Sequence, residues 1–233
     1  MNITAMIPAR IGSERLKMKN LALLNGHPLI YYAIKAAKDS GVFNKIILNS
    51  DNNLFEKIAD RYHIDFYKRP SQLGGSSVKM DDVNMDFIKN NPCDVLAIVN
   101  TPSPLQTGDE VAKAINFFKD NNFDSMIAIS ENYVHAVYNG IPINFDPEEQ
   151  FQRTQDLLPV SLLIYSIMAW NTKTFISEYE IKGRAFFCGK TGYFKASKES
   201  ALLVKNEDDL QLIDRIMRSK ENKIKYDIIA EGN

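Results

Sequence analysis

The feature that most constrains the fold is a regular alternation of short apolar runs with longer segments of helical periodicity. The apolar runs occupy residues 3–7, 45–50, 64–67, 94–100 and 124–130. The segments with apolar residues at helical spacing occupy residues 28–39, 52–63, 79–91 and 108–121. Such alternation is typical of a mostly parallel sheet with helices on both faces. We therefore expect a twisted α/β fold whose ligand site lies beyond the carboxyl ends of the strands.

The alternation stops at residue 131. Residues 131–153 contain Asn139-Gly140 and an acidic run, a pattern that predicts an irregular insertion or a hairpin with an exposed tip. Strand and helix patterns then return at residues 160–170, 172–178 and 206–219, and two short strands are predicted within residues 184–198. We expect residues 1–233 to form a single domain with an irregular lobe around residues 131–160, and residues 224–229, which are largely apolar, to be packed against a partner that the sequence does not identify.

The segment PARIGSERLKMKN, residues 8–20, directly follows the first apolar run. Gly12 allows a ligand to approach the backbone, and the backbone N–H groups of Gly12 and Ser13 can point at phosphate oxygens. Three cations, Arg10, Arg15 and Lys19, add the positive charge that a triphosphate requires. This loop predicts a polyphosphate site; the other interpretation is an ordinary turn whose cations face solvent. It matches neither the Walker nor the dinucleotide-binding pattern.

Composition limits the classes of partner. The formal net charge of −1 argues against general nucleic-acid binding, which needs a basic excess. We expect no membrane partner and a cytoplasmic location, because no apolar run reaches spanning length and residues 1–7 lack the features of a signal peptide. The two cysteines, Cys93 and Cys188, lie far apart without metal-ligand spacing, so we expect two reduced thiols and no zinc site.

Residues 7–20 resemble the signature I-P-A-R-x-G-S-x-R-L-x-x-K-N of the sugar-activating cytidylyltransferases, a group that includes the CMP-N-acylneuraminate and CMP-3-deoxy-manno-octulosonate synthetases. Residues 26–29, 49–51, 69–73, 101–106 and 206–210 are similar to further motifs of the family, in the same order. The sialic-acid enzymes more often carry Lys where this chain has Glu14, and we expect the Glu14 side chain to point outward.

The resemblance implies a nucleotidyltransferase fold, a homodimer formed partly through the insertion, and transfer of CMP from CTP to an acidic sugar of the ulosonic or acylneuraminate type, with release of pyrophosphate. It implies Mg²⁺ as the cofactor. It also implies roles for individual residues. Those that would assist catalysis are Arg10, Arg15 and Lys19; those that would bind nucleotide are Pro8, Ala9, Arg10, Gly12, Ser13, Lys19, Asn20 and Arg69; those that would bind the acid sugar are Ser103, Gln106, Arg153 and Gln155.

The chain departs from the family pattern at the metal and sugar positions. The family's metal-binding aspartates fall on Leu203 and Lys205, which cannot ligate Mg²⁺. Its strand-end arginine falls on Gln106, and a base-reading serine falls on Met80. Three interpretations stay open: Lys205 replaces part of the metal's charge, Asp208 or Asp209 recruits metal, or the chain is a catalytically impaired nucleotide-binding homologue that acts as a partner or regulatory subunit. The metal ligands are unknown at this point, and a different nucleotide or a phosphonate acceptor is a further alternative.

Overall fold

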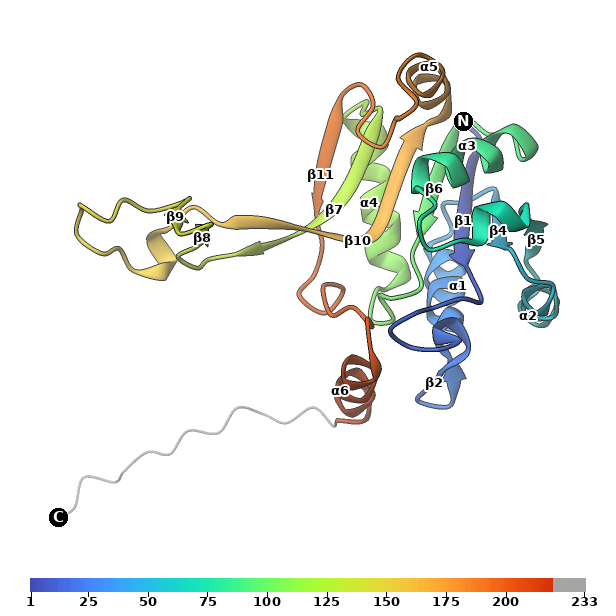
Figure 1. Ribbon diagram of the computed structural model, residues 1–233, viewed down its shortest axis with the longest axis horizontal. Helices are drawn as coiled ribbons and strands as arrows, with labels where there is room; N and C mark the ends of the chain where they lie inside the picture. Colours follow the sequence, from blue (N-terminus) through green and yellow to red (C-terminus); the bar gives the residue numbers. More distant parts are fainter. Residues whose placement is uncertain (220–233) are drawn as a thin grey trace.

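The computed structural model describes residues 1–219, so the predicted packing of residues 224–229 lies outside the described part of the chain. Its centre is a seven-stranded sheet with the order β11-β7-β10-β6-β1-β4-β5 (Figure 1). The strands are β1 (Ile3–Ala9), β4 (Lys45–Ser50), β5 (Asp65–Lys68), β6 (Val95–Val99), β7 (Ser125–Asn132), β10 (Val160–Asn171) and β11 (Thr191–Lys195).

The sheet is parallel except at β10, which runs antiparallel to both β6 and β7. The pairs β1·β4, β1·β6, β4·β5 and β7·β11 are all parallel. All five residues of β6 are buried, as expected for a central strand that is covered on both faces. The predicted twisted, mostly parallel α/β sheet is confirmed.

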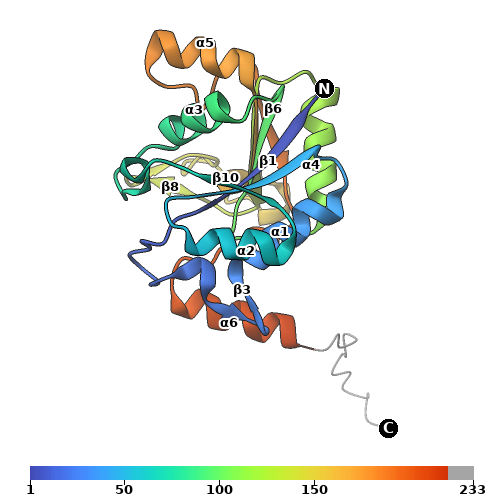
Figure 2. The ribbon, with the colours of Figure 1, turned by 90° about the vertical axis from the view of Figure 1, so that its right-hand side faces the viewer.

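Helices cover both faces of the sheet (Figure 2). The helices α1 (Leu29–Ser40), α2 (Leu54–Tyr62) and α4 (Gly108–Asp120) share one apolar cluster with the sheet. On the opposite face, α3 (Met80–Asn90) and α5 (Thr172–Lys182) share a second cluster. Trp170 of β10, the single tryptophan of the sequence, lies in that second cluster with 1% of its surface exposed, and its Nε1 donates to the Phe186 carbonyl at 2.8 Å.

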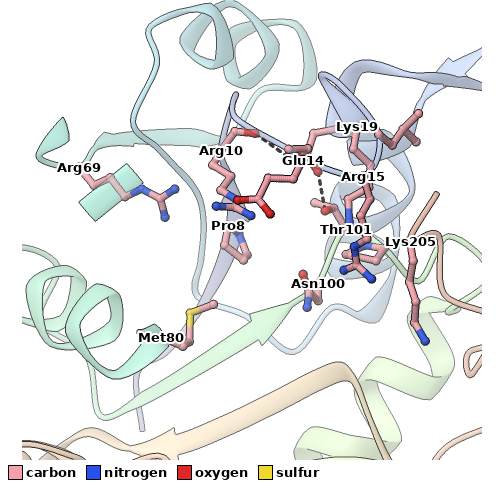
Figure 3. A pocket seen from close by; sticks show the side chains of 14 residues that line it. Pro8, Arg10, Glu14, Arg15, Lys19, Arg69, Met80, Asn100, Thr101 and Lys205 are labelled. Atoms are coloured by element: carbon pink, nitrogen blue, oxygen red, sulfur yellow. Dashed lines mark hydrogen bonds between the residues drawn. The ribbon is translucent and has the colours of Figure 1, made fainter. Parts of the chain in front are cut away.

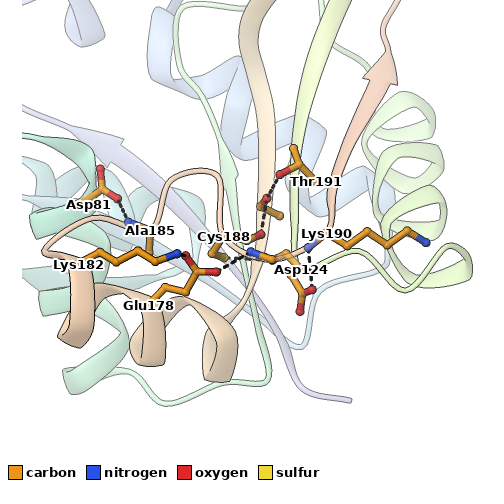
Figure 4. A network of polar contacts seen from close by, with 10 residues as sticks. Asp81, Asp124, Glu178, Lys182, Ala185, Cys188, Lys190 and Thr191 are labelled. Carbon is orange, nitrogen blue, oxygen red and sulfur yellow. Dashed lines mark hydrogen bonds and ion pairs between the residues drawn. The ribbon is translucent and has the colours of Figure 1, made fainter.

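The prediction of two strands within residues 184–198 is wrong, because the structure forms only β11 in this segment. Three backbone N–H groups before β11 donate to side-chain carboxylates and not to strand carbonyls (Figure 4). Ala185 N–H donates to Asp81, Gly189 N–H to Glu178, and Lys190 N–H to Asp124, at 2.6, 2.9 and 2.9 Å. Gly189 adopts φ +52°, and a Cβ at that position would lie 2.3 Å from the Asp124 carboxylate.

An arm projects from the sheet between β7 and β10 (Figure 1). Its base is the antiparallel pairing of residues 129–132 with residues 160–163, and its tip holds the hairpin of β8 (Val137–Tyr138) and β9 (Ile141–Pro142). Asn139 and Gly140 both have positive φ, 49° and 79°, as a two-residue type I′ turn requires. The short helix η3 (Thr154–Asp156) precedes β10.

The last described helix, α6 (Glu207–Arg218), begins at the predicted N-cap. Asn206 accepts from the Asp209 N–H, and the Asp209 side chain accepts from the Asn206 N–H, forming a capping box. The helix packs beside the hairpin of β2 (Leu23–Leu24) and β3 (His27–Pro28), which follows the short helix η1 (Lys19–Leu21). The remaining short helix is η2 (Ser71–Gly74).

Candidate functional site

A cavity of about 240 Å³ opens beyond the carboxyl ends of β1 and β6, where the sequence predicts a ligand site. Figure 3 shows side chains from the loop after β1, from the end of β6 and from the segment before α6 around it. Its lining residues are Pro8, Arg10, Ser13, Glu14, Arg15, Leu16, Lys19, Asn20, Arg69, Met80, Asn100, Thr101, Pro102 and Lys205.

Arg10, Arg15 and Lys19, the three cations expected to hold a triphosphate, line this single cavity rather than separate faces of the molecule. Arg69 and Lys205 line it as well. Five cations with different positions in the sequence therefore converge on one space. Such a concentration of like charge is stable only where an anion, solvent or a counter-charge offsets it, and a polyphosphate matches it in sign and size.

The electrostatic strain of this cluster is visible at Lys19. Burial lowers the pKa of the Lys19 ammonium, and the nearby guanidinium groups of Arg15 and Arg10 lower it further, while Asp209 acts in the opposite direction. Lys19 Nζ donates to the Val204 carbonyl at 3.3 Å, which holds the ammonium at the boundary between the loop and the segment before α6. A bound polyanion would relieve both the burial cost and the repulsion.

Asn20 shapes the loop from inside. It is buried, its Nδ2 donates to the Arg10 carbonyl at 3.2 Å, and its Oδ1 accepts from the Thr101 hydroxyl at 2.6 Å. These two bonds connect both ends of the cationic loop to the end of β6. Asn20 lines the cavity, yet its amide atoms are engaged with protein groups.

Arg69 follows β5 and forms a buried ion pair with Asp51, with Nη2 and Oδ1 3.6 Å apart. Burial lowers the pKa of Arg69, Asp51 raises it, and the charge of Arg10 lowers it. The guanidinium is thus held in place from behind by a carboxylate while it faces the cavity.

Gly12 and Ser13, whose backbone N–H groups were predicted to bind phosphate, differ in what surrounds them. The Ser13 N–H donates to the Ile11 carbonyl at 3.1 Å. Gly12 has open space where a Cβ would stand. Ala9, predicted among the nucleotide-binding residues, is buried at the end of β1. The part of Gly12 and Ser13 in phosphate binding stays a prediction.

Glu14 does not point away from the site as expected, because it lines the cavity together with Arg10 (Figure 3). The expectation rested on local charge alone. The loop folds back over the end of β6, so that residues on both sides of Gly12 face the same space. The carboxylate offsets one of the five positive charges.

A second cavity of about 300 Å³ adjoins the first. Five residues line both cavities: Arg15, Lys19, Asn100, Pro102 and Lys205. Its other wall comes from the segment before α6 and from a bulge in β10, where the register with β7 shifts between Leu163 and Met168. Tyr165 stands in this bulge with φ 53°, a strained conformation for a residue with a side chain, and Asn100 Nδ2 donates to its carbonyl at 3.1 Å.

The four predicted sugar-binding residues do not converge on one place in the described chain. Ser103 lines the second cavity, and its hydroxyl donates to the Ser200 carbonyl at 2.7 Å. Gln106 is buried, and neither of its amide atoms has a hydrogen-bond partner among the described residues. Arg153 and Gln155 lie on the arm, where Arg153 pairs with Asp156.

The residues of the site do not fit a Mg²⁺ ion. Within residues 1–219 no group of three or more His, Cys, Asp or Glu side chains is placed to hold a metal. The Leu203 side chain offers no oxygen to a metal, and the Lys205 side chain is itself a cation. Asp209, one of the alternative ligands, accepts the backbone N–H groups of Lys205 and Asn206 at 2.8 and 3.1 Å. Asp208 is exposed in the first turn of α6.

Asn100, Thr101 and Tyr165 also line the two cavities, although the sequence analysis assigned none of them an individual role. Asn100 and Thr101 directly follow a predicted strand, and the carboxyl end of a parallel strand is a signal that would have found them. The resemblance places a family strand near the sugar at residues 164–168, but the bulge in which Tyr165 stands gives no signal inside a continuous apolar run.

The sheet topology and the cationic cavity beyond its strand ends define an α/β protein of the nucleotidyltransferase fold. Among solved structures, the chain is similar to a CMP:2-keto-3-deoxy-manno-octonic acid synthetase complexed with CTP, with a TM-score of 0.71, 13% identity, and coverage of 93% of this chain and 98% of that one. It is also similar to a 4-diphosphocytidyl-2C-methyl-D-erythritol synthase from Anaerococcus prevotii, with a TM-score of 0.65, 12% identity, and coverage of 94% and 99%. At these identities the likeness shows the fold alone.

The chain belongs to the cytidylyltransferase family, whose model matches residues 4–157. It is 28% identical over 236 residues to an N-acylneuraminate cytidylyltransferase of Streptococcus agalactiae serotype V, covering 95% of this chain and 56% of that protein. It is 24% identical over 244 residues to an N-acylneuraminate cytidylyltransferase of Escherichia coli O18:K1:H7, covering 97% and 54%. The chain thus spans about half the length of the curated relatives it matches. These findings confirm the resemblance given by residues 7–20.

Proposed function

We propose that this protein transfers CMP from CTP to a hydroxyl of an acidic sugar of the ulosonic or acylneuraminate type and releases pyrophosphate. The observation that carries the proposal is the convergence of Arg10, Arg15, Lys19, Arg69 and Lys205 on one cavity at the carboxyl edge of the sheet. Membership of the cytidylyltransferase family and the names of the relatives supply the nucleotide and the acceptor class.

In the proposed reaction the acceptor oxygen forms a bond to the α-phosphorus of CTP, and the bond from that phosphorus to the bridging oxygen of pyrophosphate breaks. The chain's part is to position both reactants and to stabilise negative charge on the leaving pyrophosphate. Arg10, Arg15 and Lys19 would hold the triphosphate and stabilise this charge. Pro8, Ala9, Gly12, Ser13, Asn20 and Arg69 would shape the nucleotide site. We place the acceptor in the second cavity, because Arg15, Lys19 and Lys205 form the wall between the two spaces.

We further propose that the protein acts as a homodimer through the arm. Side chains that are large, apolar and more than half exposed crowd this projection: Val137, Tyr138, Ile141, Ile143, Phe151, Leu158 and Leu162. Exposed apolar surface on this scale is typical of an interface. A dimer would also account for the placement of Arg153 and Gln155, since residues on a projecting arm can reach the second cavity of another subunit. Residues 1–233 would then act as a single domain.

Localisation follows the proposed role in nucleotide-sugar synthesis, which places the protein in the cytoplasm with CTP. Among the described residues, no helix combines the length and the apolar character needed to cross a membrane. The other interpretation, a catalytically impaired nucleotide-binding homologue, receives no support from the names of the relatives.

The test is pyrophosphate release from CTP with a panel of eight-carbon and nine-carbon ulosonic acids, each with and without Mg²⁺. Turnover of one of these acids is the expected result. Arg15→Ala should lower kcat/KM by about 10²-fold or more, since a lost charge-stabilising donor at the transition state has effects of this size. Lys57→Ala, an exposed residue of α2, is the matched control and should leave turnover unchanged. CTP binding without turnover across the panel would contradict the proposal.

A further inference from the structure

The charge of the side chains that line the cationic cavity can be compared with the charge of a nucleoside triphosphate. Among the described residues that line this cavity there are five cations and one carboxylate, Glu14; the cations are Arg10, Arg15, Lys19, Arg69 and Lys205. The lining therefore carries four net positive charges, five minus one. A free nucleoside triphosphate carries about four negative charges near neutral pH, by the same second-ionisation rule that gives a phosphate monoester nearly two. With the Asp51 carboxylate behind Arg69 also counted, five cations minus two carboxylates leave three positive charges, so the side chains alone offset most of the charge of the ligand.

The segment before α6 is fixed against this cavity by its backbone. The Val204 N–H donates to the Pro102 carbonyl at 2.8 Å, and the Val204 carbonyl accepts from Lys19 Nζ at 3.3 Å. The Lys205 N–H donates to Asp209 at 2.8 Å. Val204 is buried, and Leu203, Val204 and Lys205 all line the second cavity. Lys205 also lines the first, so its side chain stands at the boundary between the two cavities.

These observations lead beyond the proposed function. Resting on that function, we propose that the cavity binds free CTP without a divalent cation and that the ammonium of Lys205 supplies the charge at the position where the family's metal would stand. An ammonium is a compact point charge and suits phosphate oxygens. The same ammonium would repel a divalent cation, and Leu203 beside it offers hydrocarbon.

The test measures CTP binding to the full chain by isothermal titration calorimetry, in EDTA and in excess Mg²⁺. Because MgCTP carries two fewer negative charges than free CTP, affinity in Mg²⁺ should be equal to or weaker than affinity in EDTA. Lys205→Ala should weaken binding in EDTA by about tenfold or more, the effect expected for one charge-assisted hydrogen bond. Lys57→Ala, also an exposed lysine, should change nothing.

A reversal variant sharpens the result. Leu203→Asp combined with Lys205→Asp should bind CTP poorly in EDTA and regain affinity in Mg²⁺, because two carboxylates would supply the missing oxygen ligands. Thermal unfolding of each variant would verify that it is folded. The inference is overturned if Mg²⁺ tightens binding to the unaltered protein more than about threefold, or if Lys205→Ala binds CTP in EDTA as tightly as the unaltered protein. Failure to bind CTP under either condition would instead contradict the proposed function.

Discussion

Thr101 donates its hydroxyl hydrogen to Asn20 Oδ1 across 2.6 Å, and both side chains are buried. This bond joins the end of β6 to a loop 81 positions earlier in the chain. The Nδ2 group of the same Asn20 amide donates to the Arg10 carbonyl. The cationic loop is therefore fixed by neutral hydrogen bonds, which leaves its charged side chains available to a ligand.

Asn20→Ala should lower the free energy of unfolding by about 1–3 kcal/mol, because it leaves the Thr101 hydroxyl and the Arg10 carbonyl without their partner. The measurement is urea unfolding followed by circular dichroism. Thr101→Ser keeps the hydroxyl and serves as the control, with a much smaller expected loss. A double variant, Asn20→Ala with Thr101→Val, should cost less than the sum of the two single changes; strict additivity would show that the bond carries no coupling.

Nucleotide binding should be coupled to proton uptake at alkaline pH. The pKa of Lys19 is lowered in the free protein by burial and by two guanidinium groups, and bound phosphate would raise it again. Between these two values the complex binds more protons than the free protein, so affinity should fall as the pH rises through the lowered pKa. Titration calorimetry in two buffers of different ionisation enthalpy measures the uptake. Lys19→Arg stays charged and should abolish it; an undiminished uptake in that variant would assign the proton to another group.

Asp51→Asn should destabilise the fold by about 3 kcal/mol, because breaking a buried pair leaves the Arg69 guanidinium without its counter-charge. The comparison is with Asp109→Asn, which removes the partner of Lys113 in an exposed pair where both side chains are more than two thirds exposed. That control should cost less than about 0.5 kcal/mol. Equal losses in chemical denaturation would show that the Arg69–Asp51 pair is as weak as a surface pair.

Asn206→Ala should cost about 1 kcal/mol, since it removes the capping box at the start of α6. Differential scanning calorimetry would detect the change as a lower Tm. Gln211→Ala lies on the exposed side of the same helix and should stay within about 0.5 kcal/mol of the unaltered protein. Equal Tm values for the two variants would show that the capping box contributes nothing to stability.

The arm should control the oligomeric state. Tyr138→Asp combined with Leu158→Asp places two charges on the exposed apolar surface of the arm and should convert a dimer into monomers. Light scattering after size-exclusion chromatography gives the mass directly. Ile181→Asp changes an equally exposed apolar residue of α5 and should leave the mass as it is. A dimer that survives in the arm variant, or an unaltered protein that is already monomeric, would rule out the arm as the interface.

The periodicity of the sequence was sufficient to predict the sheet and most of the helices. Strands buried on both faces and amphipathic helices leave strong local patterns in the sequence. The same patterns failed at residues 184–190, where a short apolar run that ends at Gly189 predicts a strand. There the backbone is held by Asp81, Asp124 and Glu178, which lie elsewhere in the sequence and give no local signal.

The cationic loop was predictable for a similar reason, since Arg10, Arg15 and Lys19 stand close together in sequence. The orientation of Glu14 and the bulge that holds Tyr165 could not be predicted from the sequence. Glu14 faces the cavity because the loop folds back over the end of β6, and Tyr165 depends on the register shift between β10 and β7. Both are consequences of tertiary contacts rather than of local composition.

The enclosed indole of Trp170 has a practical consequence. Because no other tryptophan occurs in the sequence, and because this one lies at the packing of β10 against α5 rather than in either cavity, its fluorescence should report loss of tertiary structure with little direct perturbation by ligand. The protein thus carries an intrinsic optical probe with which the unfolding of its variants can be compared with and without nucleotide.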